Sequence, residues 1–267
     1  MTAPTPPEVR YTDPAVPTVA RIYNYLCGGT DHFTADRRAA EQILAAVPDA
    51  RDRAQANRAF ILRTVSAMAA AGIGQFIDVG AGLPHGPAVH QAARILVPDA
   101  RVVYVDIDPV ACTLWQALLA NDDGAAAVMA DAGDPEAILA HPEVRRLIRF
   151  IAPVGVLFGA VLPFLGAAAG PGVAAFRQRM GPGSMLALSH VTATGTPPKM
   201  AAEVQDICAA AGAGVTFRTR VQVGALFGDL ALAAPGLVEV TKWPSPQPGA
   251  VTPALPILGG LARVRNR

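Results

Sequence analysis

The chain has 267 residues, of which 52% are hydrophobic and 16% are charged, and its formal net charge is +1. This composition supplies enough apolar material for a large core, and the lack of a basic block argues against nucleic acid as the main partner, because phosphate binding needs clustered Lys and Arg. The alanine-rich stretches 67–71 and 207–213 are too short to cross a bilayer, so no membrane partner is expected.

The N-terminus and the cysteines indicate where the protein works. Residues 1–17 are rich in proline and hold no apolar run of the kind that a secretory signal requires. Cys27, Cys112 and Cys208 are far apart and form no CxxC pair, which is typical of buried thiols in a reducing compartment. We therefore expect a cytoplasmic location.

Helical periodicity comes first along the chain. It predicts helices over residues 16–27, 34–46 and about 52–71. Apolar and small side chains share one side of the third helix: Phe60, Ile61, Thr64, Val65 and Met68. Because these helices precede every strand, residues 1–71 are expected to form an N-terminal arm and helical cap.

After Gly72 the pattern changes to short apolar runs that alternate with helices. The runs predict strands over residues 75–80, 101–108, 125–131, 153–162 and 183–191. Helices are predicted over residues 86–96, 109–120, 134–148 and 219–230. Continuous β-branched and aliphatic strands that alternate with helices indicate an α/β fold, with a parallel sheet covered on both faces. Closing strands in 230–243 and 259–265, joined by a Pro-rich loop over 243–256, add an antiparallel end, so that residues 72–267 form one globular unit.

The stretch FIDVGAGLP, residues 76–84, marks the edge of the sheet where a ligand is expected. Gly80 and Gly82 open the turn after the first strand, and open α/β sheets bind ligands beyond the carboxyl ends of their strands. Glycine allows the backbone to approach a ligand closely. The dinucleotide pattern G-x-G-x-x-G is incomplete because Pro84 and His85 follow, which favours a ligand without a pyrophosphate.

Acidic residues end three successive strands at this edge. Asp78 would repel a pyrophosphate but suits a ligand that carries an ammonium group. Asp106, at the tip of the next strand, can accept hydrogen bonds from both ribose hydroxyls, and Asp131 can read the adenine amino group. S-adenosylmethionine has the ammonium and no phosphate, so the pattern favours this cofactor over NAD.

The segment ARIYNYLCGGTDHFTADR, residues 20–37, resembles the signature ARxYDYxLGGKDNFxADR of an actinobacterial S-adenosylmethionine-dependent methyltransferase family, long catalogued as a domain of unknown function. The resemblance continues through NRAF (57–60), FIDVGAGLP, VVYVDIDP, DPEAIL, PGSMLALSH and FRTRVQVGALF, and so covers nearly the whole chain. It implies a Rossmann-like class I methyltransferase sheet, with S-adenosylmethionine as cofactor and S-adenosylhomocysteine as product.

The resemblance also implies that the N-terminal segment closes over the cofactor. Tyr25 and Gly28–Gly29 would lie against S-adenosylmethionine, with Asp31 or His32 near its charged end, because an aromatic face attracts a sulfonium. Together with the strand ends, this predicts a cofactor-binding set: Tyr25, Gly28, Gly29, Asp78, Gly80, Ala81, Gly82, Asp106, Ile107, Asp131, Ala132 and Gly159.

The chain departs from the family pattern at two places that bear on the reaction. Thr30–Asp31–His32 stands where the family has Lys-Asp-Asn, and Pro163 stands where the family has a histidine after the fourth strand. The second change turns a polar wall into an apolar one. An unusual substrate, a base supplied from elsewhere, or a reaction other than methyl transfer would each account for these changes.

A hydroxyl acceptor would need a general base, and histidine is the usual one. His32 and His190 are the candidate catalytic residues, although His190 could instead hydrogen-bond a backbone carbonyl. His85 and His90 lack a third ligand, so no metal site is expected.

Three functions are therefore compatible with the sequence. The first is a methyltransferase that acts on a small molecule, in secondary metabolism. The second is a protein of the same fold that holds the cofactor or its product but catalyses an elimination or cyclisation. The third is a non-catalytic subunit that binds a partner protein, or a second copy of itself, through the apolar surface near residues 156–176.

Overall fold

The computed structural model describes residues 12–192, 194–244, 253 and 255–265. Most of the loop predicted over 243–256 lies outside these residues. None of the helices in the described part is long and apolar enough to cross a membrane.

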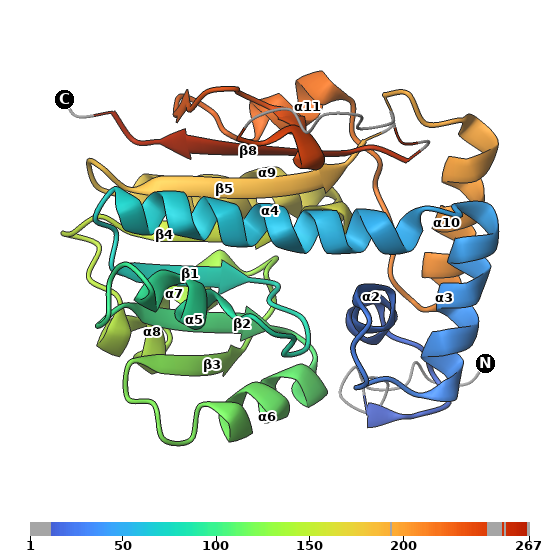
Figure 1. Ribbon diagram of the computed structural model, residues 1–267, viewed down its shortest axis with the longest axis horizontal. Helices are drawn as coiled ribbons and strands as arrows, with labels where there is room; N and C mark the ends of the chain where they lie inside the picture. Colours follow the sequence, from blue (N-terminus) through green and yellow to red (C-terminus); the bar gives the residue numbers. More distant parts are fainter. Residues whose placement is uncertain (1–11, 193, 245–252, 254, 266–267) are drawn as a thin grey trace.

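A single mixed sheet forms the centre of the molecule (Figure 1). Its strands are β1 (Gln75–Val79), β2 (Arg101–Asp106), β3 (Ala125–Met129), β4 (Gly155–Gly159), β5 (Met185–Val191), β6 (Ala231–Leu232), β7 (Val238–Glu239) and β8 (Ile257–Arg263). They are arranged in the order β3-β2-β1-β4-β5-β8-β6, and β7 also pairs with β8. The first five strands are parallel, and β8 runs antiparallel to β5. The predicted sheet, mostly parallel with an antiparallel last strand, is confirmed.

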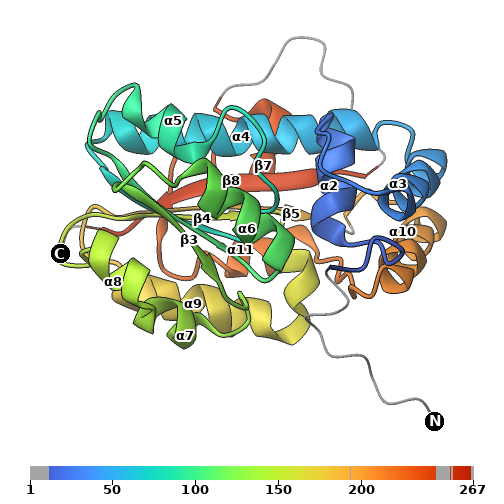
Figure 2. The ribbon, with the colours of Figure 1, turned by 90° about the horizontal axis from the view of Figure 1, so that it is seen from below.

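Helices cover both faces of the sheet, as Figure 2 shows. One face packs against α4 (Ala50–Ala70), α5 (Val89–Arg94) and α6 (Pro109–Leu118). The other face packs against α7 (Pro135–Ala140), α8 (Pro142–Leu147), α9 (Ala169–Arg179) and α11 (Arg220–Ala225). Because both faces are buried, the central strands consist of continuous apolar residues.

The structure differs from the predicted elements at proline and glycine positions. Pro142 divides the helix predicted over 134–148, because proline is accepted at the first position of a helix but not in its interior. The strand predicted in 230–243 becomes β6, β7 and the 3-10 helix η2 (Val240–Lys242), with Pro235 and the left-handed Gly236 between the two strands. The 3-10 helix η1 (Leu162–Ala168), α9 and α10 (Pro198–Ala210) were not predicted.

Three helices lie beyond the carboxyl ends of the parallel strands (Figure 1). These are α2 (Val19–Cys27), α3 (Thr34–Ala46) and α10, and their apolar side chains, with Ala50 and Ala54 at the start of α4, form most of a third core cluster. The helix α4, which the sequence assigned to the cap, instead packs along the sheet and extends past it toward α3. We use the term cap below for α2, α3 and α10.

Asp36 holds the N-terminal part of the cap together. Its carboxylate accepts the backbone N–H groups of Thr18 and Phe33, and it pairs with Arg21, whose Nε lies 2.9 Å away. Both charged side chains are fully buried. The cap is also tied to the sheet, since the Thr18 hydroxyl donates to Asp108, directly after β2.

Candidate functional site

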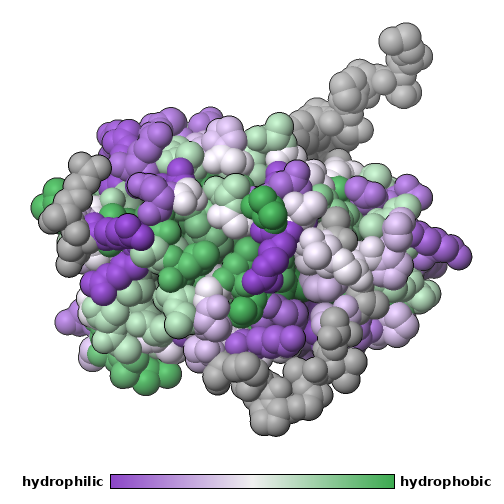
Figure 3. Space-filling model, turned by 90° about the horizontal axis from the view of Figure 1, so that it is seen from above, coloured by the Kyte–Doolittle hydropathy of each residue, from purple (hydrophilic) through white to green (hydrophobic). Residues whose placement is uncertain are grey.

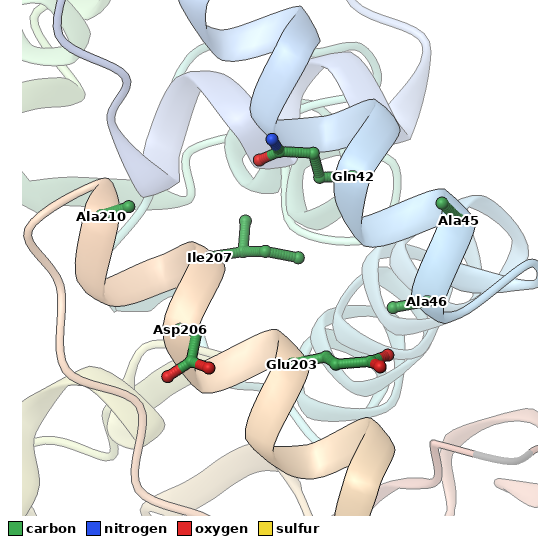
Figure 4. A pocket seen from close by; sticks show the side chains of 7 residues that line it. All are labelled: Gln42, Ala45, Ala46, Glu203, Asp206, Ile207 and Ala210. Atoms are coloured by element: carbon green, nitrogen blue, oxygen red, sulfur yellow. The ribbon is translucent and has the colours of Figure 1, made fainter.

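A cavity of about 500 Å³ opens where the cap meets the carboxyl ends of β1 to β4. It is lined by residues from the strand ends, from α2 and α4, and from α10 with the segment 212–217 that follows it. A second hollow, shown in Figure 4, is a surface groove between α3 and α10. Three alanines, two acids, Gln42 and Ile207 line that groove, and no strand end reaches it, so the cavity is the candidate site.

The glycine turn after β1 forms one wall of the cavity. Gly80 and Gly82 both adopt positive φ, +72° and +65°, which side chains rarely tolerate. A Cβ on Gly80 would lie 2.3 Å from the Val161 side chain, whereas a Cβ on Gly82 would meet nothing within 4 Å. The backbone at Gly82 therefore faces open space, which a ligand can enter.

The three predicted carboxylates meet in this cavity. Burial raises the pKa of Asp78 to about 7, with nearby Arg58 opposing the shift and Asp106 adding to it. Burial also raises the pKa of Asp106 to about 6, although its carboxylate accepts the backbone N–H groups of Gly82 (2.7 Å) and Asp108 (2.9 Å). Asp131, at the end of β3, lines the cavity and accepts the N–H of Gly133.

The remaining predicted strand-end residues, Ala81, Ile107, Ala132 and Gly159, also line the cavity. Two aromatic side chains behind them fix the wall. Tyr104 and Trp115 stack with ring centroids 3.9 Å apart, and the Trp115 indole N–H donates to the Gly82 carbonyl at 2.9 Å. The turn is thus held by side chains as well as by its own backbone.

Sequence reasoning missed three polar residues that α4 brings to the cavity, Arg53, Asn57 and Arg58. Arg58 donates through Nη2 to the Pro87 carbonyl at 2.8 Å, and its buried Nε has no hydrogen-bond partner among the described residues. A signal was present in the sequence. Asn57 falls on the apolar side of the helix, four residues before Ile61, where a polar side chain has to be satisfied.

The structure does not bring Tyr25, Gly28, Gly29 or His32 to the cavity lining; Tyr23 takes that place. Residues two positions apart lie on opposite sides of a helix, so only one of the two tyrosines can face inward. Tyr25 instead donates its hydroxyl to Glu41 and contacts the His32 ring.

The glycine pair has a structural role at the end of α2. Gly28, at φ +89°, donates its N–H to the Tyr25 carbonyl, and Gly29 donates to that of Asn24. This is a left-handed helix cap. His32 then hydrogen-bonds the Gly29 carbonyl through Nε2 at 3.1 Å. Burial, together with the Arg58 charge, lowers the pKa of His85 beside the glycine turn, and Asp31, the neighbour of His32, opposes that shift.

His190 is fully buried and is also absent from the lining. Its Nδ1 donates to the Val191 carbonyl at 2.5 Å, so its Nε2 must accept from Arg218, 2.7 Å away. Burial, with the Arg218 charge, lowers its pKa to about 4. The ring is held neutral between two partners, and Arg218 in turn donates to the Leu162 carbonyl at the start of η1. This geometry gives His190 a structural role and contradicts a role as general base.

The apolar surface expected near residues 156–176 is not a surface in the structure. Most of its large side chains are buried in the core, and Val161, Pro163, Phe164 and Leu165 line the cavity. Figure 3 shows the face above β8 and α11, where hydrophobic patches are separated by hydrophilic side chains. Among the described residues, no group of three His, Cys, Asp or Glu side chains could hold a metal ion.

A family model described as S-adenosyl methyltransferase matches residues 7–265. A methyltransferase-family structure from Thermobifida fusca is 38% identical over 94% of this chain and 96% of its own, with a TM-score of 0.88. A DUF574 family structure from Streptomyces avermitilis is 34% identical over 94% and 98%, also with a TM-score of 0.88.

More distant structures share the fold alone. An O-methyltransferase family protein from Burkholderia thailandensis is 16% identical over 82% of this chain and 61% of its own, with a TM-score of 0.51. A comparison with curated proteins finds no significant match.

Proposed function

The chain belongs to the S-adenosyl methyltransferase family, and from this premise we propose that it transfers a methyl group from S-adenosylmethionine to a small molecule, of the kind made in secondary metabolism. S-adenosylmethionine is the cofactor of this family. The observation that carries the proposal is the meeting of three strand-end carboxylates and a glycine turn in one cavity.

The three described cysteines are free and buried, which supports a reducing, cytoplasmic location.

The adenosine half of the cofactor fits the strand ends. Asp106 has one oxygen bound to Gly82 N–H and the other to Asp108 N–H, and each oxygen keeps a lone pair for a ribose hydroxyl. Ile107 has an apolar side chain that is 43% exposed and could pack on one face of the adenine. Asp131 and Ala132 line the cavity beside it and could hydrogen-bond the adenine edge. A Cβ at Gly82 would meet nothing within 4 Å, which leaves open space for a sugar beside this backbone.

The methionine half of the cofactor needs opposite charges side by side, because an α-amino acid is a zwitterion. Asp78 would take the ammonium and Arg58 the carboxylate. The two charges act on each other, since the Arg58 guanidinium opposes the burial-driven rise of the Asp78 pKa. The partnerless Nε of Arg58 is the donor that such a carboxylate would satisfy.

Held by Asp78, Asp106 and Arg58, the cofactor would supply an activated methyl group: its S–C bond would break with the electron pair staying on sulfur, and a hydroxyl acceptor would release its proton to solvent as the methyl bonds to oxygen. The protein's own task is then to position the two reactants and to keep water out of the cavity. Pro163, Val161 and Phe164 form an apolar wall that serves the second purpose.

That same wall supports the alternative of a non-methylating elimination or cyclisation. Neither His32 nor His190 lines the cavity, and Pro163 stands in the wall at the position where the sequence resemblance implies a histidine. The two functions differ in one product. Methyl transfer releases S-adenosylhomocysteine in step with turnover, whereas the alternative converts substrate without consuming S-adenosylmethionine.

Calorimetry with S-adenosylmethionine tests the cofactor proposal. Asp106→Ala should weaken binding by about 1–3 kcal/mol, because it strands the ribose hydroxyls. Asp123→Ala, an exposed acid in the loop between α6 and β3, is the matched control and should leave the affinity unchanged. Equal affinities for the two variants would remove the proposed site.

A further inference from the structure

We propose that the part of the cavity beneath the cap is the acceptor subsite, and that it selects an uncharged, mainly apolar molecule that carries a hydrogen-bond donor. By acceptor subsite we mean the lining contributed by α2, α10 and segment 212–217. The inference rests on the proposed function and names the substrate class of that same site.

Charge is divided between the two parts of the cavity. Every charged side chain in the lining comes from α4 or from a strand end: Arg53, Arg58, Asp78, Asp106 and Asp131. The lining side chains that come from the cap and from segment 212–217 carry no charge. Examples are Ile22, Leu26, Val204 and Phe217. One cavity thus combines a polar half that suits the cofactor with an apolar half that the cofactor does not need.

Burial sets what this apolar half can accept. A charged acceptor would lose its hydration there, and the side chains of α2, α10 and segment 212–217 would offer it no counter-charge, which is unfavourable. An apolar acceptor would gain by removing its own surface from water. Cys208 also adds no charge to this lining, because burial raises the pKa of its thiol to about 11 and keeps it neutral.

Among the described residues that line the cavity, one buried acceptor atom, on Asn57, lacks a hydrogen-bond partner. The Tyr23 hydroxyl donates its single proton to the Ala54 carbonyl at 3.0 Å, so it must accept from the Asn57 side chain, whose Nδ2 lies 2.9 Å away. This fixes the amide orientation and leaves Asn57 Oδ1 as the buried acceptor without a hydrogen bond in the described structure. Asn57 is 1% exposed and lines the cavity.

A buried carbonyl oxygen of this kind favours a ligand that brings an N–H or O–H group. Two ligands could supply that donor, the acceptor molecule or the amino group of the cofactor. The tests below separate the two sources.

The test uses three probes of one shape, added to the full-length protein saturated with S-adenosylhomocysteine. They are 2-naphthol, which is neutral with one donor, naphthalene, which has none, and naphthalene-2-sulfonate, which is charged. Ligand-observed NMR should rank the affinities as 2-naphthol, then naphthalene, then the sulfonate, with at least tenfold between the first and the last. Equal binding of the three, or tightest binding of the sulfonate, would overturn the inference.

Variants assign the binding to the subsite. Asn57→Leu should remove the advantage of 2-naphthol over naphthalene and leave the affinity for S-adenosylhomocysteine within about twofold. A loss of S-adenosylhomocysteine affinity alone would assign the donor to the cofactor and overturn this part of the proposal.

Two further variants narrow the subsite itself. Val204→Phe fills the α10 wall, and Gly214→Leu adds a side chain where a Cβ meets no atom within 4 Å, so that it can fold even if Val204→Phe does not. Either should weaken both neutral probes at least tenfold. Gly170→Leu on α9, equally open but outside the lining, is the matched control.

The cofactor measurement distinguishes the two proposals. If the variants leave the affinity for the probes unchanged while S-adenosylhomocysteine still binds, the acceptor subsite is refuted and the proposed function stands. Failure of the unaltered protein to bind S-adenosylhomocysteine would refute the proposed function itself.

Discussion

At the scale of single residues, the site depends on two acids whose pKa values lie far above the ordinary value. Asp78, at about 7, and Asp106, at about 6, are raised mainly by burial from 3.8. In the free protein, the folded state therefore holds these protons more tightly than the unfolded state. Their contribution makes the free energy of unfolding fall as the pH rises from about 4 to 7.

Ligand binding should show the opposite dependence on pH. The ammonium of S-adenosylhomocysteine pairs with ionised Asp78, so binding requires loss of its proton. The affinity should rise about tenfold between pH 6 and pH 8, following the ionised fraction of a group with a pKa near 7.

Calorimetry in buffers of different ionisation enthalpy should detect the proton released near pH 6.5. 5′-Methylthioadenosine, which has no ammonium, serves as the control and should show the dependence only near pH 6 and below. An affinity for S-adenosylhomocysteine that is flat with pH would argue against the pairing with Asp78.

Arg58 can be tested by the same pair of ligands. Arg58→Met keeps the length and the apolar stem of the side chain but removes the guanidinium, so it should weaken S-adenosylhomocysteine by about 1.5–3 kcal/mol. 5′-Methylthioadenosine lacks the carboxylate and should bind the variant as before. Arg145→Met, on the exposed side of α8, should change neither affinity. An equal loss for both ligands would show a structural role instead.

At the scale of elements, a buried ion pair joins α2 to α3 within the cap, where helix propensity alone would not hold α2. The helix α2 has only nine residues, and a helix this short is not stable alone in water. Asp36 stabilises it by accepting the N–H of Thr18 at its start and by pairing with Arg21 one turn later. The packing of α2 against α3 thus depends on the Asp36 carboxylate.

Removal of that carboxylate should loosen the cap. Asp36→Ala leaves the Arg21 charge buried without this partner and should cost about 3–5 kcal/mol in unfolding free energy. Urea unfolding measures the loss, with Asp52→Ala on the exposed side of α4 as the control. Because the cap covers the cavity, the affinity for S-adenosylhomocysteine should fall as well. A variant as stable as the control would contradict this account.

At the scale of the whole molecule, the cavity lies between three separate apolar clusters, two on the faces of the sheet and one in the cap. A ligand there contacts all three, in addition to the contacts that already join the cap to the rest of the molecule, such as the bond from Thr18 to Asp108 and the packing of α2 on Ala54 of α4. Binding should therefore stabilise the cap against the sheet.

Hydrogen exchange measures this coupling. At a hundredfold excess over the dissociation constant, S-adenosylhomocysteine should stabilise the protein by about 2.7 kcal/mol. The slowed amides should include α2 and the first half of α4 as well as the turn at Gly80–Gly82. Added 2-naphthol should then extend the protection to α10. Protection confined to the glycine turn would mean that the cap does not close on the ligand.

The sequence by itself determined the sheet, the glycine turn and the three acids. These are local features, because a strand is read from its own apolar residues and parallel strands bring their carboxyl ends to one edge. The positions of Asp78, Asp106 and Asp131 at the ends of predicted strands were thus enough to predict that the three lie together at one edge of the sheet. Proline and glycine explain most of the differences in element boundaries, as at Pro142 and Gly236.

Only the tertiary structure decided which side of each helix faces the cavity. Tyr23 and not Tyr25 points inward, Asn57 and Arg58 reach the site from α4, and His190 is enclosed between its neighbours. Each outcome depends on packing between segments far apart in the chain, such as α2 against α4 or β5 against Arg218. A local pattern marks Asn57 on the apolar side of its helix but does not encode that packing, so the positions of Tyr23, Tyr25 and His190 relative to the cavity followed only from the fold.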